Sequence, residues 1–147
     1  MKVLMLSNDL ALLGAKTSTG DTVSRHCAYG QLIERLSIIV LVKKGNFQPL
    51  ALSPRVSSYP TKASAWAYSY LKNILAVATD LFRGNHYDLI VCQDPFFTGL
   101  AGCCLKKKYG SKLLIDFHGD FWANPYWLQE NPLRLSLLAL SKLTIKK

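Results

Sequence analysis

The chain has 147 residues, 50% of them hydrophobic, and carries a formal net charge of +9. This length suits one domain with a sizeable core, and the apolar content excludes an intrinsically disordered chain. No apolar run approaches the ~18 residues that span a bilayer. The opening MKVLMLSND favours a strand over a secretory signal peptide, so we expect a cytoplasmic protein.

The cysteines indicate reduced thiols rather than a metal site. Cys27, Cys92, Cys103 and Cys104 show no Cys-x-x-Cys spacing, and the last two are adjacent. This pattern disfavours zinc and is typical of core or helix thiols in a reducing compartment. We therefore do not expect a zinc site.

The positive charge has two interpretations. Most of the clustered basic residues lie near the ends of two predicted helices: Lys106, Lys107, Lys108, Arg134, Lys142, Lys146 and Lys147. They either complement helix dipoles or form a surface for anionic lipid or a polyanionic substrate. No nucleic-acid-binding module is recognisable, so nucleic acid is not expected as a partner.

Strands and helices are expected to alternate along the first half. In chain order these are a strand over 2–7, a Ser/Thr/Gly-rich loop over 14–21, a helix over 22–35, a buried strand over 37–42, a polar turn region over 45–54 and a short edge strand over 55–59. Asp21 or Thr22 would cap the first helix. Its core-facing residues are predicted to be Val23, Cys27, Leu32 and Leu36.

The second half continues the alternation. It predicts a helix over 63–82, a buried strand over 87–93, a helix over 96–109, a buried strand over 111–117, an aromatic loop over 121–127 and a last helix from 131 onward. Asp94-Pro95 suits a helix start, and Gly110 suits a helix end. The pattern predicts an α/β fold with a doubly wound parallel sheet. Such a sheet normally continues with another strand, so we expect a larger protein.

Polar residues follow the predicted strands. The run SKLLIDFHGDFW over 111–122 passes from apolar residues directly into Asp116, His118 and Asp120, and Asp9 and Asp94 follow two earlier strands. In open α/β sheets ligands bind at the carboxyl ends of the strands. This edge is therefore the predicted site, with His118 as its first candidate.

Four segments, in this order, resemble a known family. They are MKVLMLSND, Arg25-x-x-x-Tyr29, YDLIVCQDPFFTGLAG and LLIDFHGDFW. Together they resemble the N-terminal domain of a family-4-type (group 1) glycosyltransferase of the GT-B fold. The resemblance implies that residues 1–147 form the Rossmann-like, acceptor-side domain and that the C-terminal donor-binding domain is absent. It implies transfer of a sugar from a nucleoside-diphosphate sugar to a glycan or lipid-linked acceptor, with retention. It also implies that neither a metal ion nor another bound cofactor is needed.

The resemblance also implies roles for residues near the donor. His118 corresponds to the histidine beside the donor sugar, where it would stabilise an oxocarbenium-like transition state; the alternative is a structural histidine. Gly20 and Arg25 would approach the donor phosphates. The paired glycines usual in that loop are missing, and Asp21 would repel a phosphate. Arg25 alternatively pairs with Asp21 on the helix surface.

Other residues are candidates for acceptor binding. Asp94 or Gln93 would hydrogen-bond an acceptor hydroxyl, and Phe96 would support a sugar ring. Asp120 and Trp122 would complete the acceptor side. The alternatives are that Asp94 only caps a helix and that Phe96 only packs.

Two further functions stay open. The first is a non-catalytic Rossmann-like partner, or a membrane-recruiting subunit, of a split glycosyltransferase. The second is a nucleotide-binding α/β protein of flavodoxin or dehydrogenase type, although no G-x-G-x-x-G follows the first strand.

Overall fold

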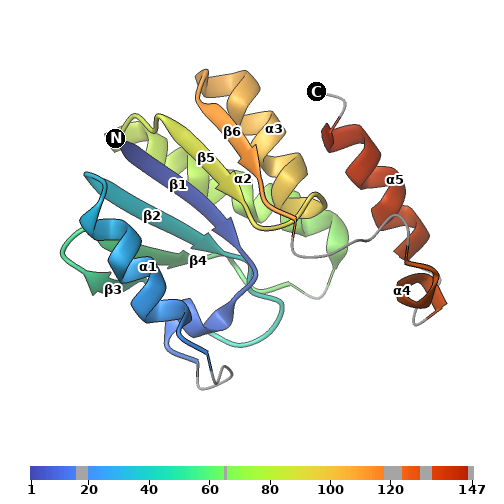
Figure 1. The fold of residues 1–147 in the computed structure, drawn as a ribbon, viewed down its shortest axis with the longest axis horizontal. Helices are drawn as coiled ribbons and strands as arrows, with labels where there is room; N and C mark the ends of the chain where they lie inside the picture. The colour runs from blue at the N-terminus through green and yellow to red at the C-terminus, as the bar shows by residue number, and fades with distance from the viewer. Residues whose placement is uncertain (16–19, 65, 118–123, 130–133, 146–147) are drawn as a thin grey trace.

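The protein folds around one mixed sheet, seen in a computed structural model (Figure 1). The structure describes residues 1–15, 20–64, 66–117, 124–129 and 134–145. The strands are β1 (Lys2–Ser7), β2 (Arg35–Val40), β3 (Leu50–Ser53), β4 (Val56–Pro60), β5 (Leu89–Cys92) and β6 (Lys112–Ile115). The helices are η1 (Leu10–Leu13, a 3-10 turn), α1 (Thr22–Gln31), α2 (Ala67–Gly84), α3 (Phe97–Tyr109), α4 (Pro125–Gln129) and α5 (Arg134–Ile145).

The strand order creates a topological switch point in the middle of the sheet. The order is β3-β4-β2-β1-β5-β6, and every neighbouring pair is parallel except β3 with β4. From β1 the chain moves to β2 on one side and later returns to β5 on the other. The connections therefore diverge between β1 and β5, which is where ligands bind in folds of this kind.

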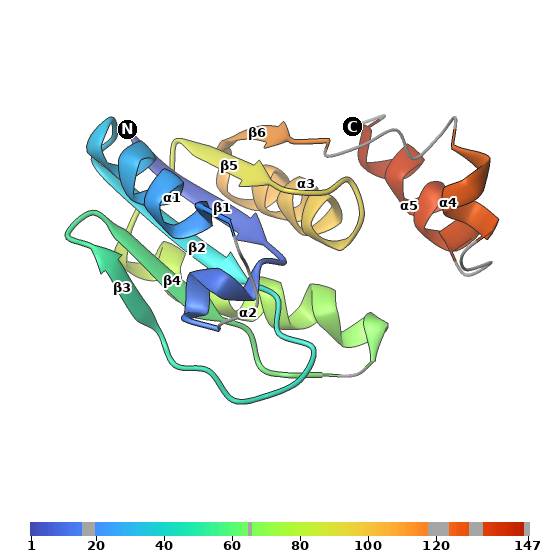
Figure 2. The same cartoon turned by 60° about the horizontal axis from the view of Figure 1, so that its bottom comes forward.

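Helices lie on both faces of the sheet (Figures 1 and 2). Alternate residues of β1 pack on the two faces of the sheet, because successive side chains of a strand point in opposite directions. Leu4 and Leu6 pack in the cluster that contains α2 and α3, whereas Val3 packs in the cluster with Leu12 and Leu13 of η1. The prediction of a doubly wound, Rossmann-like sheet is confirmed.

Two glycines allow helices to approach the sheet closely. A Cβ at Gly30 of α1 would lie 2.3 Å from Cγ2 of Val56, and one at Gly102 of α3 would lie 2.4 Å from Sγ of Cys92. Such distances exclude any larger side chain unless the backbone moves. Both helices therefore rest on the sheet through a position that only glycine fills.

The predicted first helix is too long and its buried face is wrong. The helix ends at Gln31 because β2 already begins at Arg35. Of the four residues predicted to face the core, Val23 and Leu32 are exposed, Cys27 is half-buried, and Leu36 is buried but belongs to β2. The buried residues of α1 are Thr22, His26 and Gly30. The close approach at Gly30 turns this polar stripe toward the sheet and leaves the apolar residues outside. Asp21 stands at the N-cap position without a side-chain capping hydrogen bond.

Several strand predictions need correction. The segment 45–54 contains β3, which the sequence analysis missed, and β3 rather than β4 forms the edge of the sheet. The strand over 111–117 is shorter than predicted and is not fully buried: β6 is the opposite edge, and Leu114 is 52% exposed. Of the segment 121–127 expected to be an aromatic loop, residues 125–127 belong to α4, and residues 121–123 lie outside the described part of the chain.

The structure contains four free thiols, those of Cys27, Cys92, Cys103 and Cys104. Among the described helices, none combines the length and the apolar character needed to cross a membrane.

Candidate functional site

The carboxyl ends of β1 and β5 bring four polar side chains together at the switch point. The parallel register pairs Leu6 with Cys92, so the next two residues of each strand follow side by side. Ser7 Oγ donates a hydrogen bond of 2.6 Å to Gln93 Oε1, and Asn8 Nδ2 donates one of 2.6 Å to Asp94 Oδ2. These four side chains, one hydroxyl, two amides and one carboxylate, form the candidate site, which we call the polar row.

Asp94 holds the turn that leads into α3. Its Oδ1 accepts a hydrogen bond of 2.7 Å from the Phe96 amide, and its carbonyl accepts one of 3.0 Å from Thr98 Oγ1. Both carboxylate oxygens are thus engaged, one by the turn and one by Asn8. The carboxylate is half-buried, and a ligand hydroxyl would meet it together with the exposed Asn8 amide.

The turn after β1 is fixed by a second aspartate. Asp9 Oδ1 accepts a hydrogen bond of 2.9 Å from the Ala11 amide and so caps η1, while the Asp9 amide donates to Ser7 Oγ at 3.0 Å. This acidic residue therefore has a structural role. It positions Ser7 and the neighbouring Asn8 at the sheet edge.

Beneath the site the sheet is buried. Cys92 is fully buried, and burial raises the pKa of its thiol far above the ordinary value, so it stays protonated. Among the described residues, no three His, Cys, Asp or Glu side chains gather closely enough to hold a metal ion.

The predicted donor-phosphate residues lie on the surface at the start of α1. Gly20 is exposed, and Arg25 Nη1 lies 3.8 Å from Asp21 Oδ1 with both side chains largely in solvent. The alternative surface pair is thus present in the structure. An exposed pair of this kind contributes little to stability.

Phe96 is stacked against an aromatic ring from α4. The rings of Phe96 and Trp127 lie 5.8 Å apart and nearly parallel, at 8°. The Arg134 guanidinium carbon lies 5.0 Å from the centre of the Trp127 ring, and its Nη1 donates to the Trp127 carbonyl at 2.7 Å. Phe96 therefore packs, as one of the two interpretations expected, and it does so beside the candidate site.

Three predicted residues lie outside the described part of the chain: His118, Asp120 and Trp122. They follow β6, whose last neighbours Asp116 and Phe117 are exposed, with the Asp116 amide donating to the Cys92 carbonyl at 2.8 Å. Their roles stay predictions.

Sequence reasoning missed Ser7 and Asn8. Both follow a predicted strand, as Asp94 does, and this position was the available signal. What the sequence lacked was the neighbour of β1: only the strand order shows that β5 places Gln93 and Asp94 beside them.

Comparison with known proteins identifies the architecture. One solved structure that the chain resembles is the sucrose-phosphate synthase from Thermosynechococcus elongatus, with a TM-score of 0.67 and 12% sequence identity. The chain therefore has the fold of one Rossmann-like half of the GT-B architecture. The similarity covers 95% of this chain but only 40% of the synthase chain, so the chain corresponds to less than half of that protein. No protein-family model matches the sequence, and the comparison with curated proteins found no match.

Proposed function

We propose that the chain is the acceptor-side domain of a glycosyltransferase. The complete enzyme would move a sugar from a nucleoside-diphosphate sugar to a glycan or lipid-linked acceptor. It would do so with retention, without a metal, and at the cytoplasmic side of a membrane. The donor-binding half would be a C-terminal domain or a separate chain, and the 147 residues alone would be inactive. The observation that carries this proposal is the GT-B-like fold.

The position of the polar row supports the same function. Ser7, Asn8, Gln93 and Asp94 lie at the switch point of the sheet, where doubly wound folds bind ligands. Amides and a carboxylate are suited to hydrogen bonds with sugar hydroxyls. The acceptor would bind there. Asp120 and Trp122, from the segment after β6, would contact it, and Phe96 would support a sugar ring.

The donor side would use different residues. His118 would donate or accept a hydrogen bond at the reacting sugar and stabilise the charge of the transition state. Gly20 and Arg25 would face the diphosphate from the start of α1. Arg25 is the stronger of the two assignments because its present partner, Asp21, is exposed and weakly held.

Acceptor binding is tested with the chain itself. We expect the chain to retain a subset of glycans or lipid-linked sugars on an acceptor array, and Trp122→Ala to lose that binding. Tyr29→Ala, an exposed aromatic residue on α1, is the control and should bind like the parent. An array without a single bound glycan would contradict the acceptor-side assignment.

Catalysis is tested in the enzyme that also contains the donor-binding half. His118→Ala is expected to lower kcat by ~100-fold and to change KM little, because a group that acts in the transition state affects the chemical step. His86→Ala is the control, since His86 is exposed at the opposite end of β5. Equal turnover of the two variants would mean that His118 has only a structural role.

A further inference from the structure

A hollow of about 730 Å³ lies beside β4, away from the polar row. Three parts of the chain line it: the loop over 45–49, the segment 59–63 at and after the end of β4, and the second half of α2. Figure 2 shows the loop before β3 and the segment after β4 on the same side of the molecule. We call this space the β4 hollow. Because β2 separates β4 from β1 in the strand order, the β4 hollow and the polar row are different places on the sheet.

Two prolines explain why the sheet opens at this position. β3 and β4 pair in antiparallel register, with Leu50 opposite Ser58. Beyond this pair the chain continues through Pro49 on one side and through Pro60 on the other, and proline has no amide hydrogen with which to extend the ladder. The loop before β3 therefore separates from β4 and leaves space between them.

Both walls of the β4 hollow are anchored in the fold. Phe47 is half-buried and packs against the hydrophobic cluster that contains Val42, and Gly45 turns the loop with a φ of 91°. On the other wall, the Thr61 amide donates to the Val40 carbonyl at 2.9 Å, and Thr61 Oγ1 accepts from the Val42 amide at 2.9 Å. The β4 hollow is therefore bounded by segments that the sheet itself positions.

The lining combines half-buried apolar surface with exposed polar groups. The half-buried side chains include Phe47, Tyr59, Val77 and Leu81, and the exposed ones include Asn46, Gln48, Lys62 and Asp80. Within the described part of the chain, the two amide side chains and the tyrosine hydroxyl have no hydrogen-bonding partner. Each of these groups can both donate and accept a hydrogen bond. A volume of this size and a mostly apolar lining with a few polar groups are typical of small-molecule sites, which span ~300–1,000 Å³.

The charges around the β4 hollow disfavour an anionic ligand. Asp80 Oδ1 lies 2.9 Å from Nη1 of Arg83, so Lys62 is the one cation left over among the described lining residues. The residues that α2 contributes lie in its C-terminal half, toward the negative end of the helix dipole. A single exposed ammonium group in that field is a weak site for a phosphate or a nucleotide.

An extended peptide is also poorly matched. Peptides that add to a sheet use main-chain donors and acceptors of a free strand, and Pro49 and Pro60 offer no amide hydrogen there. A sugar ring, in contrast, presents C–H groups on its face and hydroxyls at its edge. Rings such as those of Tyr59 and Phe47 suit the face, and amides such as that of Gln48 suit the hydroxyls.

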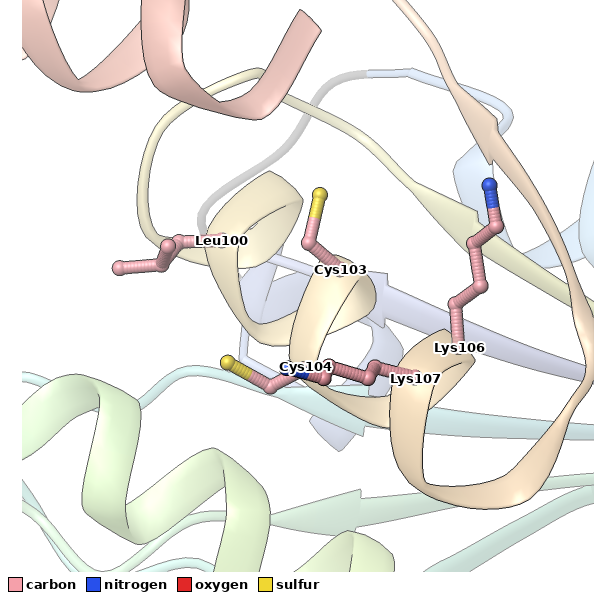
Figure 3. Close-up of a pocket in the computed structure, with 5 residues that line it drawn as sticks. All are labelled: Leu100, Cys103, Cys104, Lys106 and Lys107. Carbon is pink, nitrogen blue, oxygen red and sulfur yellow. The ribbon is translucent and has the colours of Figure 1, made fainter. Parts of the chain in front are cut away.

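A second hollow, on α3, lacks these features. Its volume is about 340 Å³, and its described lining comes from one helix: Leu100, Cys103, Cys104, Lys106 and Lys107. Figure 3 shows these five side chains directed to different sides of α3. They include neither an aromatic ring nor an amide, so the argument for a sugar applies to the β4 hollow and not to this one.

We propose that the β4 hollow binds uncharged sugar units of a glycan. Tyr59 and Phe47 would pack against ring faces, and Asn46 and Gln48 would form hydrogen bonds with hydroxyl groups. The site would retain a glycan at a distance from the polar row, whether or not the chain takes part in sugar transfer.

The test is NMR spectroscopy of the isotope-labelled chain, titrated with linear hexasaccharides of glucose, galactose, mannose and N-acetylglucosamine. We expect at least one hexasaccharide to shift the amide signals of residues 45–48 and 61–63, and uridine diphosphate to leave them unchanged. Gln48→Ala should weaken this binding by about threefold and Tyr59→Leu by about tenfold, the effects of one lost hydrogen bond and of a lost ring with its hydroxyl.

Matched controls change the same residue types elsewhere. Gln31→Ala removes an exposed amide at the end of α1, and Tyr29→Leu removes a tyrosine that is 48% exposed on the same helix. Neither residue lines the β4 hollow. Both controls should bind the hexasaccharide like the parent, and circular dichroism should show that all variants are folded.

Three results would overturn the proposal. The first is that none of the hexasaccharides shifts the signals of the β4 hollow. The second is that uridine diphosphate shifts them, which would assign the β4 hollow to a nucleotide. The third is that Gln48→Ala and Tyr59→Leu both bind like the parent. Shifts confined to the polar row would also reject a glycan site in the β4 hollow but would support the acceptor-side assignment, so the two proposals fail separately.

Discussion

Asn8, after β1, donates a hydrogen bond of 2.6 Å to Asp94, after β5, across the switch point of the sheet. The two residues are 86 positions apart in sequence, and the contact exists only because β1 and β5 are parallel neighbours. It joins the turn that leads to η1 to the turn that leads to α3. The candidate site is therefore formed by residues from both halves of the chain.

The first prediction concerns this contact. Asn8→Asp replaces the amide donor by a second carboxylate facing Asp94, so at neutral pH the hydrogen bond becomes a repulsion. We expect the free energy of unfolding to fall by about 1 kcal/mol. At acid pH, where one of the two carboxyls carries a proton, most of the difference from the parent should disappear. Urea unfolding at both pH values measures this.

The control for that experiment is Asn46→Asp, in an exposed loop. It introduces the same charge without a facing carboxylate and should unfold like the parent at both pH values. A loss of stability in the control that equals the loss in Asn8→Asp would mean that the added charge, not the contact, is responsible.

The second prediction concerns the contact of α3 with the sheet. In Gly102→Ala the new Cβ would lie 2.4 Å from Cys92 Sγ and 2.7 Å from Leu113 Cδ1. Overpacking of this kind costs about 1 to 3 kcal/mol, because buried neighbours must move. Gly84→Ala, with no atom within 4 Å of its added methyl group, should be neutral or slightly stabilising. Thermal unfolding of the two variants tests this difference, and equal midpoints would contradict it.

Strong local patterns allowed much of the sheet to be predicted. β1 was predicted at its observed bounds, and α3 within one residue, because apolar residues at strand or helix spacing are bounded there by clear end signals. Gly110, for example, adopts a φ of 75° as the left-handed cap of α3. The strand β3 was missed because the short segment LALS lies between polar turns and pairs only with β4.

Helix faces were harder to predict than helix positions. The apolar periodicity of α1 suggested that Val23 and Leu32 face the core, yet the close contact at Gly30 decides the orientation. In α5 the hydrogen bond from Thr144 to Pro95 does the same. At the site, Asp94 was predictable from its place after a strand, whereas the importance of Asn8 depended on the order of the strands.

The third prediction concerns alkaline pH. Tyr87 is fully buried, and its hydroxyl donates a hydrogen bond of 2.9 Å to Ser37 Oγ. Burial raises the pKa of Tyr87 above its ordinary value of 10.0. Above that value the unfolded chain loses the phenolic proton while the folded chain keeps it, so stability falls as pH rises. Tyr87→Phe should lose part of this alkaline decline.

The measurement is urea unfolding from neutral pH to above pH 10. At neutral pH, Tyr87→Phe should be less stable by about 1 kcal/mol, the contribution of the lost hydrogen bond. Tyr29→Phe, at a 48% exposed position, is the control and should follow the parent curve. If Tyr87→Phe declines as steeply as the parent, another group causes the alkaline loss.

The last prediction concerns the attachment of α5. Thr144→Val keeps the shape of the side chain but removes the donor to the buried Pro95 carbonyl. An unsatisfied buried carbonyl costs about 1 to 3 kcal/mol, and this cost should fall on the contact of α5 with α3 rather than on the sheet. Amide hydrogen exchange should therefore accelerate in α5 while β1 keeps its protection. Thr79→Val is the control, because Thr79 accepts only a marginal bond of 3.5 Å from Tyr109. Equal acceleration in α5 and β1 would show that Thr144 stabilises the whole domain instead.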